Sequence, residues 1–178
     1  MSRYLSVEGV VLAVTPYGEA DAVITLYTRE YGRIDARARS IRSVSAKLRG
    51  EASLYQHVRA LLVHTVLGYR ITDARATAEK RWSPRAHYFG RNLTKFFLSL
   101  VRGPEEDPVL WEYVEGMFAS ATHLPTSKEE LLHAKTILLA RLGYADATHI
   151  LTEGEILRII RANHLWEDVH SLRARSVF

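Results

Sequence analysis

Cysteine is absent from all 178 residues of the chain. This absence excludes disulfide bonds, thiol nucleophiles, iron–sulfur clusters and every zinc site built on cysteine. Long apolar runs are missing too, since no stretch approaches the 18 or so residues that a membrane-spanning helix needs. The apolar N-terminal segment is interrupted by Glu8 and Gly9, which is not typical of a secretory signal. We therefore expect a cytoplasmic protein that does not contact a membrane.

The common signatures of enzymes are also missing. The sequence contains no GxSxG, Walker, GxGxxG or HExxH motif, and no two of its eight histidines form a close metal-binding pair. Two acids of one loop, Glu19 and Asp21, leave a Mg²⁺-dependent nuclease open as a minor alternative. Carboxylates in such a loop more often cap backbone amides or pair with arginines. The sequence predicts no catalytic residue, no metal and no cofactor.

Positive charge is present mainly in the first half of the chain. Residues 1–81 hold 13 basic and 8 acidic side chains, a net charge of +5, whereas residues 82–178 hold 11 and 12, a net charge of −1. The whole chain carries +4. This asymmetry predicts a polyanionic partner for the first half, and it favours nucleic acid over a membrane surface.

The first half has the pattern of short strands. Segments rich in branched and aromatic residues, separated by Gly-bearing turns, are Leu5–Val14, Ala22–Arg29, Arg33–Arg42, Tyr55–Val66 and Tyr69–Thr77. The fourth of these also has a composition that a helix would tolerate, and residues 43–52 indicate a loop or a short helix. Five strands without long helices between them predict a small closed antiparallel barrel over residues 1–81.

The second half has the pattern of helices. Helix starts are indicated by Ser83-Pro84, by Asp107-Pro108, and by two capping-box pairs, Ser127 with Glu130 and Thr152 with Glu155. Four or five helices with short connections predict an all-α bundle over residues 82–178. The predicted fold is thus a β domain followed by an α domain.

The most informative stretch runs from Arg33 to Arg49. Its strict alternation from Arg33 to Ser40 places Arg33, Asp35, Arg37 and Arg39 on one strand face. Guanidinium groups match phosphate oxygens and stack on bases, so this face suits a nucleic-acid backbone, with aromatic residues nearby as stacking surfaces. Solubility of a strand edge is the alternative explanation. The predicted DNA-binding residues are Arg33, Arg37, Arg39, Arg42, Lys47 and Arg49, with Tyr27 and Tyr31 stacking on bases.

Aromatic residues of the helical half are expected to be core. They lie in helical stripes, which usually pack inside a bundle, although an exposed remainder would form a groove for a partner peptide. Basic side chains beside the first stripe would flank such a groove. These predicted partner-binding residues are Arg91, Lys95 and Arg102.

With these residues in view, the chain resembles the RecO family of bacterial recombination mediators. The resemblance covers about the first 80 residues. It is carried by Glu8–Leu12, Tyr17–Asp21, Ile24–Gly32, Ala38–Arg42 and Ser45–Arg49. In the helical half, Leu138–Gly143 agrees in character only.

The resemblance implies an N-terminal OB fold followed by a helical domain. It implies binding of single- and double-stranded DNA, annealing of complementary strands, and cooperation with RecR in loading RecA. It further implies contact between the helical domain and the acidic, Phe-terminated tail of single-strand DNA-binding protein. The family's basic surface falls on Arg37, Arg39 and Arg42, and its acidic loop, with an inferred structural role, on Glu19 and Asp21.

The chain departs from the family in three respects. Many members carry a four-cysteine zinc module after the Leu-Gly that matches Leu142-Gly143, whereas this chain has no cysteine and is shorter. Ser40 stands where a glycine is common. The predicted function is a RecO-like mediator without enzymatic activity. The alternative is an adaptor whose barrel and bundle bind proteins rather than DNA.

Overall fold

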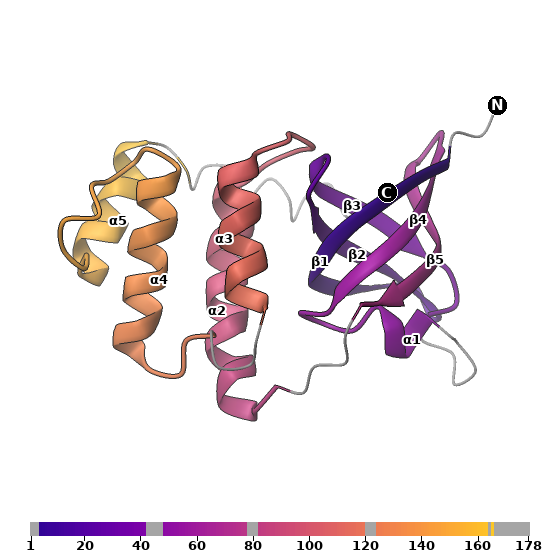
Figure 1. Ribbon diagram of the computed structural model, residues 1–178, viewed down its shortest axis with the longest axis horizontal. Helices are drawn as coiled ribbons and strands as arrows, with labels where there is room; N and C mark the ends of the chain where they lie inside the picture. Colours follow the sequence, from indigo (N-terminus) through magenta and orange to yellow (C-terminus); the bar gives the residue numbers. More distant parts are fainter. Residues whose placement is uncertain (1–3, 42–47, 78–81, 120–123, 164, 166–178) are drawn as a thin grey trace. The chain divides into compact units, whose positions relative to one another are not determined.

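The structure, a computed structural model, describes residues 4–41, 48–77, 82–119, 124–163 and 165 (Figure 1). Described residues of Met1–Trp82 and Gly103–His123 form one compact unit, and those of Ser83–Arg102 and Leu124–Phe178 form a second. The elements are β1 (Tyr4–Tyr17), β2 (Asp21–Thr28), β3 (Gly32–Ala38), α1 (Leu48–Glu51), β4 (His57–Thr65), β5 (Gly68–Ala76), α2 (Pro84–Leu100), α3 (Pro108–Phe118), α4 (Lys128–Arg141) and α5 (Glu153–Ala162).

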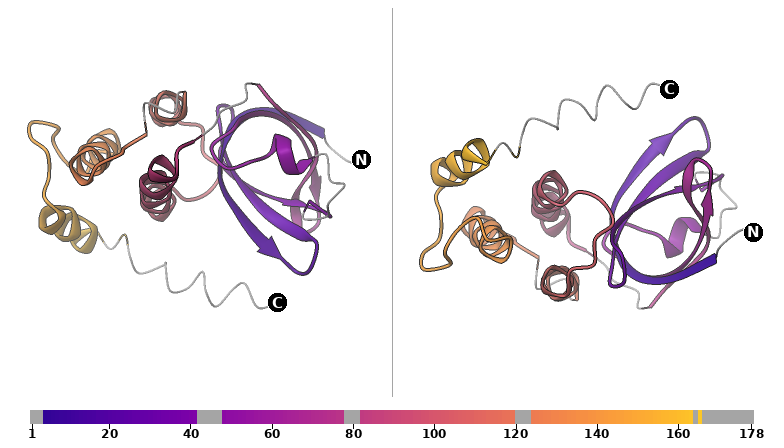
Figure 2. Two further views of the ribbon diagram at one scale, coloured as in Figure 1. Left: turned by 90° about the horizontal axis from the view of Figure 1, so that it is seen from below. Right: turned by 90° about the horizontal axis from the view of Figure 1, so that it is seen from above.

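The strands form a closed five-stranded barrel in the order β1-β2-β3-β5-β4, seen as a ring in Figure 2. β1 closes the ring because it pairs with β2 and with β4. The prediction of a barrel is confirmed, but the prediction that it is antiparallel throughout is wrong, since β3 and β5 run parallel. A ring with an odd number of strands cannot alternate direction all the way round, so at least one neighbouring pair must be parallel.

Alternation along β3 has the predicted phase. Ile34, Ala36 and Ala38 are buried inside the barrel, whereas Arg33, Asp35 and Arg37 lie on the outer face. α1 lies at the lower end of the barrel in Figure 1, and Ala52, which follows it, belongs to the barrel core. Residues from every strand complete this core, among them Val7, Val11, Ile24, Leu26, Val58, Leu62 and Ile71. The outer face of β3 is therefore held by an apolar interior.

Two predicted strand ends are corrected. β1 continues through Pro16 to Tyr17 instead of breaking near Thr15, because Pro16 lies close to the strand's end, where one missing N–H costs little. β3 ends at Ala38 and not at Arg42. Ser40 has a left-handed φ of +52°, a conformation that no regular strand contains and that explains why glycine suits this position.

The third helix packs within the barrel's unit. Phe118 of α3 stacks on Tyr55 with ring centroids 4.9 Å apart, and Trp82 meets Tyr55 edge to face at 5.9 Å. Trp111 and Tyr113 of the same helix are buried, as the core interpretation of the aromatic stripe predicts. The compact unit of the barrel thus includes a helical segment that lies beyond residue 81 in the sequence.

The second unit contains α2, α4 and α5, each with the predicted N-cap. Ser83, Ser127 and Thr152 accept hydrogen bonds from backbone N–H groups three residues later. Thr152 and Glu155 form the complete capping box that the sequence predicts, and at the start of α4 the Glu130 carboxylate also accepts hydrogen bonds from Thr126. Within the described ranges, every helix is too short or too polar to cross a bilayer.

Candidate nucleic-acid interface

One carboxylate organises the C-terminal end of β3. An oxygen of Asp21 accepts hydrogen bonds from Nε and Nη2 of Arg37 at 3.0 and 2.7 Å, and its second oxygen accepts one from the backbone N–H of Ser40 at 2.8 Å. The Ser40 N–H, and after it the Arg37 guanidinium, hold the pKa of Asp21 below its ordinary value. Asp21 therefore fixes both the turn after β3 and the direction of Arg37.

An exposed aromatic ring lies against this pair. The guanidinium carbon of Arg37 lies 4.5 Å from the centre of the Tyr17 ring, a cation–π distance. Tyr17 is 45% exposed, so much of its ring remains open to solvent. Sequence reasoning missed Tyr17, because its position beside Arg37 depends on the pairing of β1, β2 and β3.

Two further arginines extend the positive charge. Arg39 is exposed after β3 and is close enough to contribute to the lowered pKa of Asp21. Arg70 on β5 lies directly opposite Arg37 in the parallel register, and its neighbour Ile71 is buried, which places Arg70 on the outer face. Arg70 was also missed, since the β3–β5 pairing cannot be read from alternation. We call Tyr17, Asp21, Arg37, Arg39 and Arg70 the open end of the barrel face.

The other end of the same face is covered, and we call it the closed end (Tyr27, Thr28, Gly32, Arg33). A side chain at position 32 would overlap the carbonyl oxygen of Glu105, so the segment before α3 lies directly on this hairpin. The Arg33 side chain is 18% exposed, against 39% for Arg37, and its guanidinium lies 3.3 Å from Asp35. Acidic residues from the segment before α3 therefore lie where a phosphate would have to approach.

The prediction that Tyr27 stacks on a base is wrong. Its side chain has no exposed surface. Burial, with Asp107 and Glu105 nearby, raises the pKa of its hydroxyl. Tyr27 does point to the outer face, as predicted, but residues distant in sequence cover it.

The remaining predicted DNA-binding residues are dispersed. Tyr31, at the tip of the β2–β3 hairpin, is 37% exposed and lies at the far end of β3 from Arg37. The backbone of Arg49 belongs to α1, and its side chain lies outside the described part of the structure. Arg42 and Lys47 fall outside the described residues. Of the eight predicted residues, the structure thus brings Arg37 and Arg39 together at the open end.

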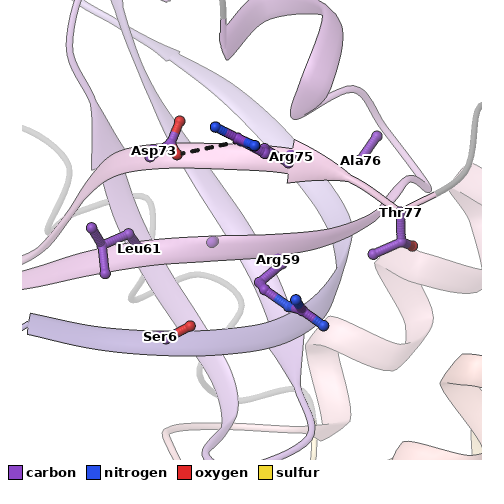
Figure 3. A pocket seen from close by; sticks show the side chains of 8 residues that line it. Ser6, Arg59, Leu61, Asp73, Arg75, Ala76 and Thr77 are labelled. Atoms are coloured by element: carbon purple, nitrogen blue, oxygen red, sulfur yellow. Dashed lines mark ion pairs between the residues drawn. The ribbon is translucent and has the colours of Figure 1, made fainter.

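A second basic surface surrounds a hollow of about 520 Å³ on β1, β4 and β5, shown in Figure 3. Arg59 and Arg75 lie directly opposite each other in its wall. The Arg75 side chain extends toward Asp73, with 3.9 Å between Nε and a carboxylate oxygen, whereas the Arg59 side chain points in another direction. Because the two guanidiniums diverge, the hollow does not present both to one phosphate.

Acidic and imidazole groups are the side chains that a metal or acid–base site would need. Both Asp21 oxygens already accept hydrogen bonds, which gives this residue the structural role that the family resemblance implies. In the part of the chain that the structure describes, no three His, Asp or Glu side chains gather as a metal site requires.

The predicted partner-binding residues lie in the second unit. Arg91 and Lys95 are exposed and one helical turn apart on α2, next to the exposed ring of Tyr88. Arg102 follows the helix, and its Nη2 lies 3.4 Å from the carbonyl oxygen of Leu165.

A known protein family matches the barrel. The family described as Recombination protein O N terminal matches residues 1–77, which contain all five strands. DNA repair protein RecO from Bacillus mycoides (strain KBAB4) is 34% identical over 59 residues, which are 33% of this chain and 24% of the relative. The RecO proteins of Bacillus cytotoxicus and Bacillus cereus (strain AH187) are 32% identical over the same shares.

The matched stretch thus spans about a quarter of the length of these relatives. Residues 1–77, which the family model matches, are the range where the residue pattern resembles RecO, and the closed barrel agrees with the OB fold expected there. Over residues 1–77, the chain is similar to the N-terminal part of the RecO family of DNA repair proteins.

Proposed function

We propose that the chain binds DNA through the open end of its barrel and acts as a mediator in recombinational repair. The observation that carries this proposal is the grouping of Arg37 and Arg39 around one carboxylate beside an exposed ring, with Arg70 opposite Arg37 on the neighbouring strand. Such a group offers phosphates a positive surface and offers an unpaired base a stacking surface.

The Asp21–Arg37 pair supports this proposal by holding the site in place before binding. Arg37 is fixed by two hydrogen bonds and by its contact with Tyr17, so little side-chain freedom is lost when a strand arrives. Arg39 and Arg70 have no ion pair within 4.0 Å in the described part of the chain, which leaves their charge for phosphate oxygens.

The specific activities that we propose are those that the resemblance to the RecO family implies. We include the binding of both single and double strands, annealing of complementary strands, and loading of RecA together with RecR. Residues 1–81 would serve as the DNA-binding domain and residues 82–178 as the partner-binding domain. Neutralising phosphates of two strands lowers their mutual repulsion, which is how a basic barrel would promote annealing.

A protein partner is proposed for α2. The exposed Tyr88, Arg91 and Lys95 combine one aromatic surface with two positive charges on one helix. An acidic peptide that ends in phenylalanine, such as the tail of single-strand DNA-binding protein, has the complementary chemistry. No enzymatic step is part of the proposal.

The test is fluorescence anisotropy of a labelled single-stranded oligonucleotide, titrated at several salt concentrations. The variant Arg39→Ala/Arg70→Ala removes two charges from the open end without breaking the Asp21–Arg37 pair. Each lost phosphate contact flattens the log–log salt slope by about 0.7, so we expect a change of about 1.4. The control, Arg158→Ala/Arg161→Ala, removes two exposed charges from α5.

The control should keep the wild-type slope. An unchanged slope in the Arg39→Ala/Arg70→Ala variant would remove the open end from the interface. Absence of binding by the wild type at low salt would overturn the DNA-binding proposal, and the protein adaptor would then become the favoured function.

A further inference from the structure

A row of four residues crosses the barrel from the open end and leads away from the β2–β3 face. In the strand ladders, Arg37 of β3 lies opposite Arg70 of β5, Arg70 opposite Val63 of β4, and Val63 opposite Tyr4 of β1. We call these four residues the cross-strand row. Neighbouring strands lie about 4.8 Å apart, so the row runs for about 14 Å from Arg37 to Tyr4.

The far half of the row points outward, like its two arginines. On β1, Leu5 packs against the barrel core and Ser6 lines the outer hollow of Figure 3, so Tyr4 shares the outer face with Ser6. On β4, the residue before Val63 belongs to the core, which turns Val63 outward. Val63 is nevertheless only 4% exposed, so neighbouring side chains cover it. Its neighbours across the ladders are Tyr4 and Arg70.

The row ends on an exposed aromatic ring. Tyr4 is 63% exposed, more than Tyr17, whose ring lies against Arg37 at the other end of the row. Aromatic rings therefore stand at both ends, and the guanidiniums of Arg37 and Arg70 stand between them. Proteins that bind single strands combine stacking rings and positive charge in this way.

Carboxylates border the row along the two parallel strands. Asp35 lies two residues before Arg37 on β3, and Asp73 lies three residues after Arg70 on β5. Both acids are exposed on the outer face. Because β3 and β5 are parallel, they lie on opposite sides of the row, which itself contains no acidic side chain. A phosphate backbone is therefore favoured across the strands, along the row.

We propose that a single strand leaves the open end along the cross-strand row and that Tyr4 stacks on one of its bases. Arg37 and Arg70 hold the phosphates between the two rings. The length of the row corresponds to about four nucleotides at the 3.4 Å spacing of a stacked strand. The inference rests on the proposed function, because the open end must first hold the strand. It extends the DNA site from β2 and β3 to β5, β4 and the first half of β1.

The inference predicts that the Tyr4 ring acts on single strands alone. A base of a single strand is free to stack on an aromatic ring, whereas a duplex base must first leave its pair and its stack, at a cost of a few kcal/mol. Phosphates of both DNA forms are equally able to contact Arg37 and Arg70. Loss of the ring should therefore weaken single-strand binding and leave duplex binding unchanged.

The experiment measures the anisotropy of two labelled probes with the full chain, a strand of twelve thymidines and a mixed-sequence duplex of twelve base pairs. The variant Tyr4→Leu removes the ring but keeps an apolar side chain beside Val63, and Tyr4→Phe keeps the ring without its hydroxyl. The control, Ile150→Ala, shortens an exposed apolar side chain of the second unit. Circular dichroism compares the fold of all four proteins.

Tyr4→Leu should bind the single strand about fivefold more weakly than wild type, the lower end of what one stacked base contributes. Its salt slope and its duplex affinity should stay those of wild type, because no phosphate contact is lost. Tyr4→Phe and the control should match wild type on both probes. Wild-type affinity of Tyr4→Leu for the single strand, or an equal loss on the duplex, overturns the inference but leaves the proposed function intact. Failure of the wild type to bind either probe overturns the proposed function itself.

Discussion

The two ends of the β2–β3 face are built from the same pair of strands, yet they differ in accessibility. At the open end, Arg37 contacts an exposed Tyr17 and an Asp21 carboxylate that fixes its direction. At the closed end, Tyr27 is fully buried, and the segment at Glu105 lies against Gly32. Alternation decides which side chains point outward, but it does not decide which of them meet solvent.

The difference teaches where a ligand can bind on this barrel. Acidic residues at 105 and 107 lie beside Tyr27, so the closed end is both covered and unfavourable for phosphate. The open end combines exposure with positive charge. The largest predicted effects therefore concern stability at the closed end, and binding effects are expected at the open end.

Two tyrosines test the comparison most strongly. Tyr27→Ala should lower the free energy of unfolding by about 3–5 kcal/mol, because it leaves a cavity under the covering segment. Tyr17→Ala should lower it by less than about 1 kcal/mol but weaken single-strand binding by about 1–3 kcal/mol, the value of one stacked base. Urea denaturation and anisotropy measure the two effects, and equal destabilisation by both substitutions would contradict the comparison.

Two glycines with similar backbone angles sharpen the comparison between the open and the closed end. Gly32 and Gly18 have φ values of +60° and +63°. Alanine at position 32 meets the Glu105 carbonyl in addition to the strain of its φ, so we expect a loss of about 2–4 kcal/mol in the free energy of unfolding. Gly18 has open space around it, and Gly18→Ala should cost only about 1 kcal/mol. Similar losses in urea denaturation would show that the segment at Glu105 does not pack on Gly32.

Acidification should weaken the open end. Folding lowers the pKa of Asp21 below its ordinary value of 3.8, mainly through the Ser40 N–H and then Arg37. The carboxylate therefore stabilises the folded state above pH 3.8, and this contribution is lost as the pH falls through the lower pKa of the folded state.

The free energy of unfolding of Asp21→Asn should consequently fall less steeply than that of wild type below about pH 4. Glu19→Gln, which removes an exposed carboxylate of the same loop, serves as the control. Parallel curves for wild type and Asp21→Asn would show that the Asp21 contacts add nothing to stability.

Much of the barrel could be predicted from local sequence. The burial of Ile34, Ala36 and Ala38 follows from alternation, and the N-caps at Ser83, Ser127 and Thr152 follow from side chains that bond the nearest free N–H groups. These features depend on residues only a few positions apart.

The site could be predicted only in part. Arg37 and Arg39 could be predicted because they lie two positions apart in one alternating stretch, whereas Arg70 and Tyr17 join them through pairings that alternation does not specify. Tyr27 was misjudged because its cover comes from a segment about 80 residues away. Contacts between distant segments are the information that residue patterns lack.

The central claim is that DNA contacts the open end and not the closed end. The absence of native cysteine allows a photoreactive crosslinker to be attached at one introduced cysteine, in Glu19→Cys beside the open end or in Glu106→Cys beside the closed end. Both positions are exposed and both substitutions remove one negative charge. With a labelled single strand, we predict a crosslinking yield several-fold higher from position 19. Equal yields, or a higher yield from position 106, would contradict the claim.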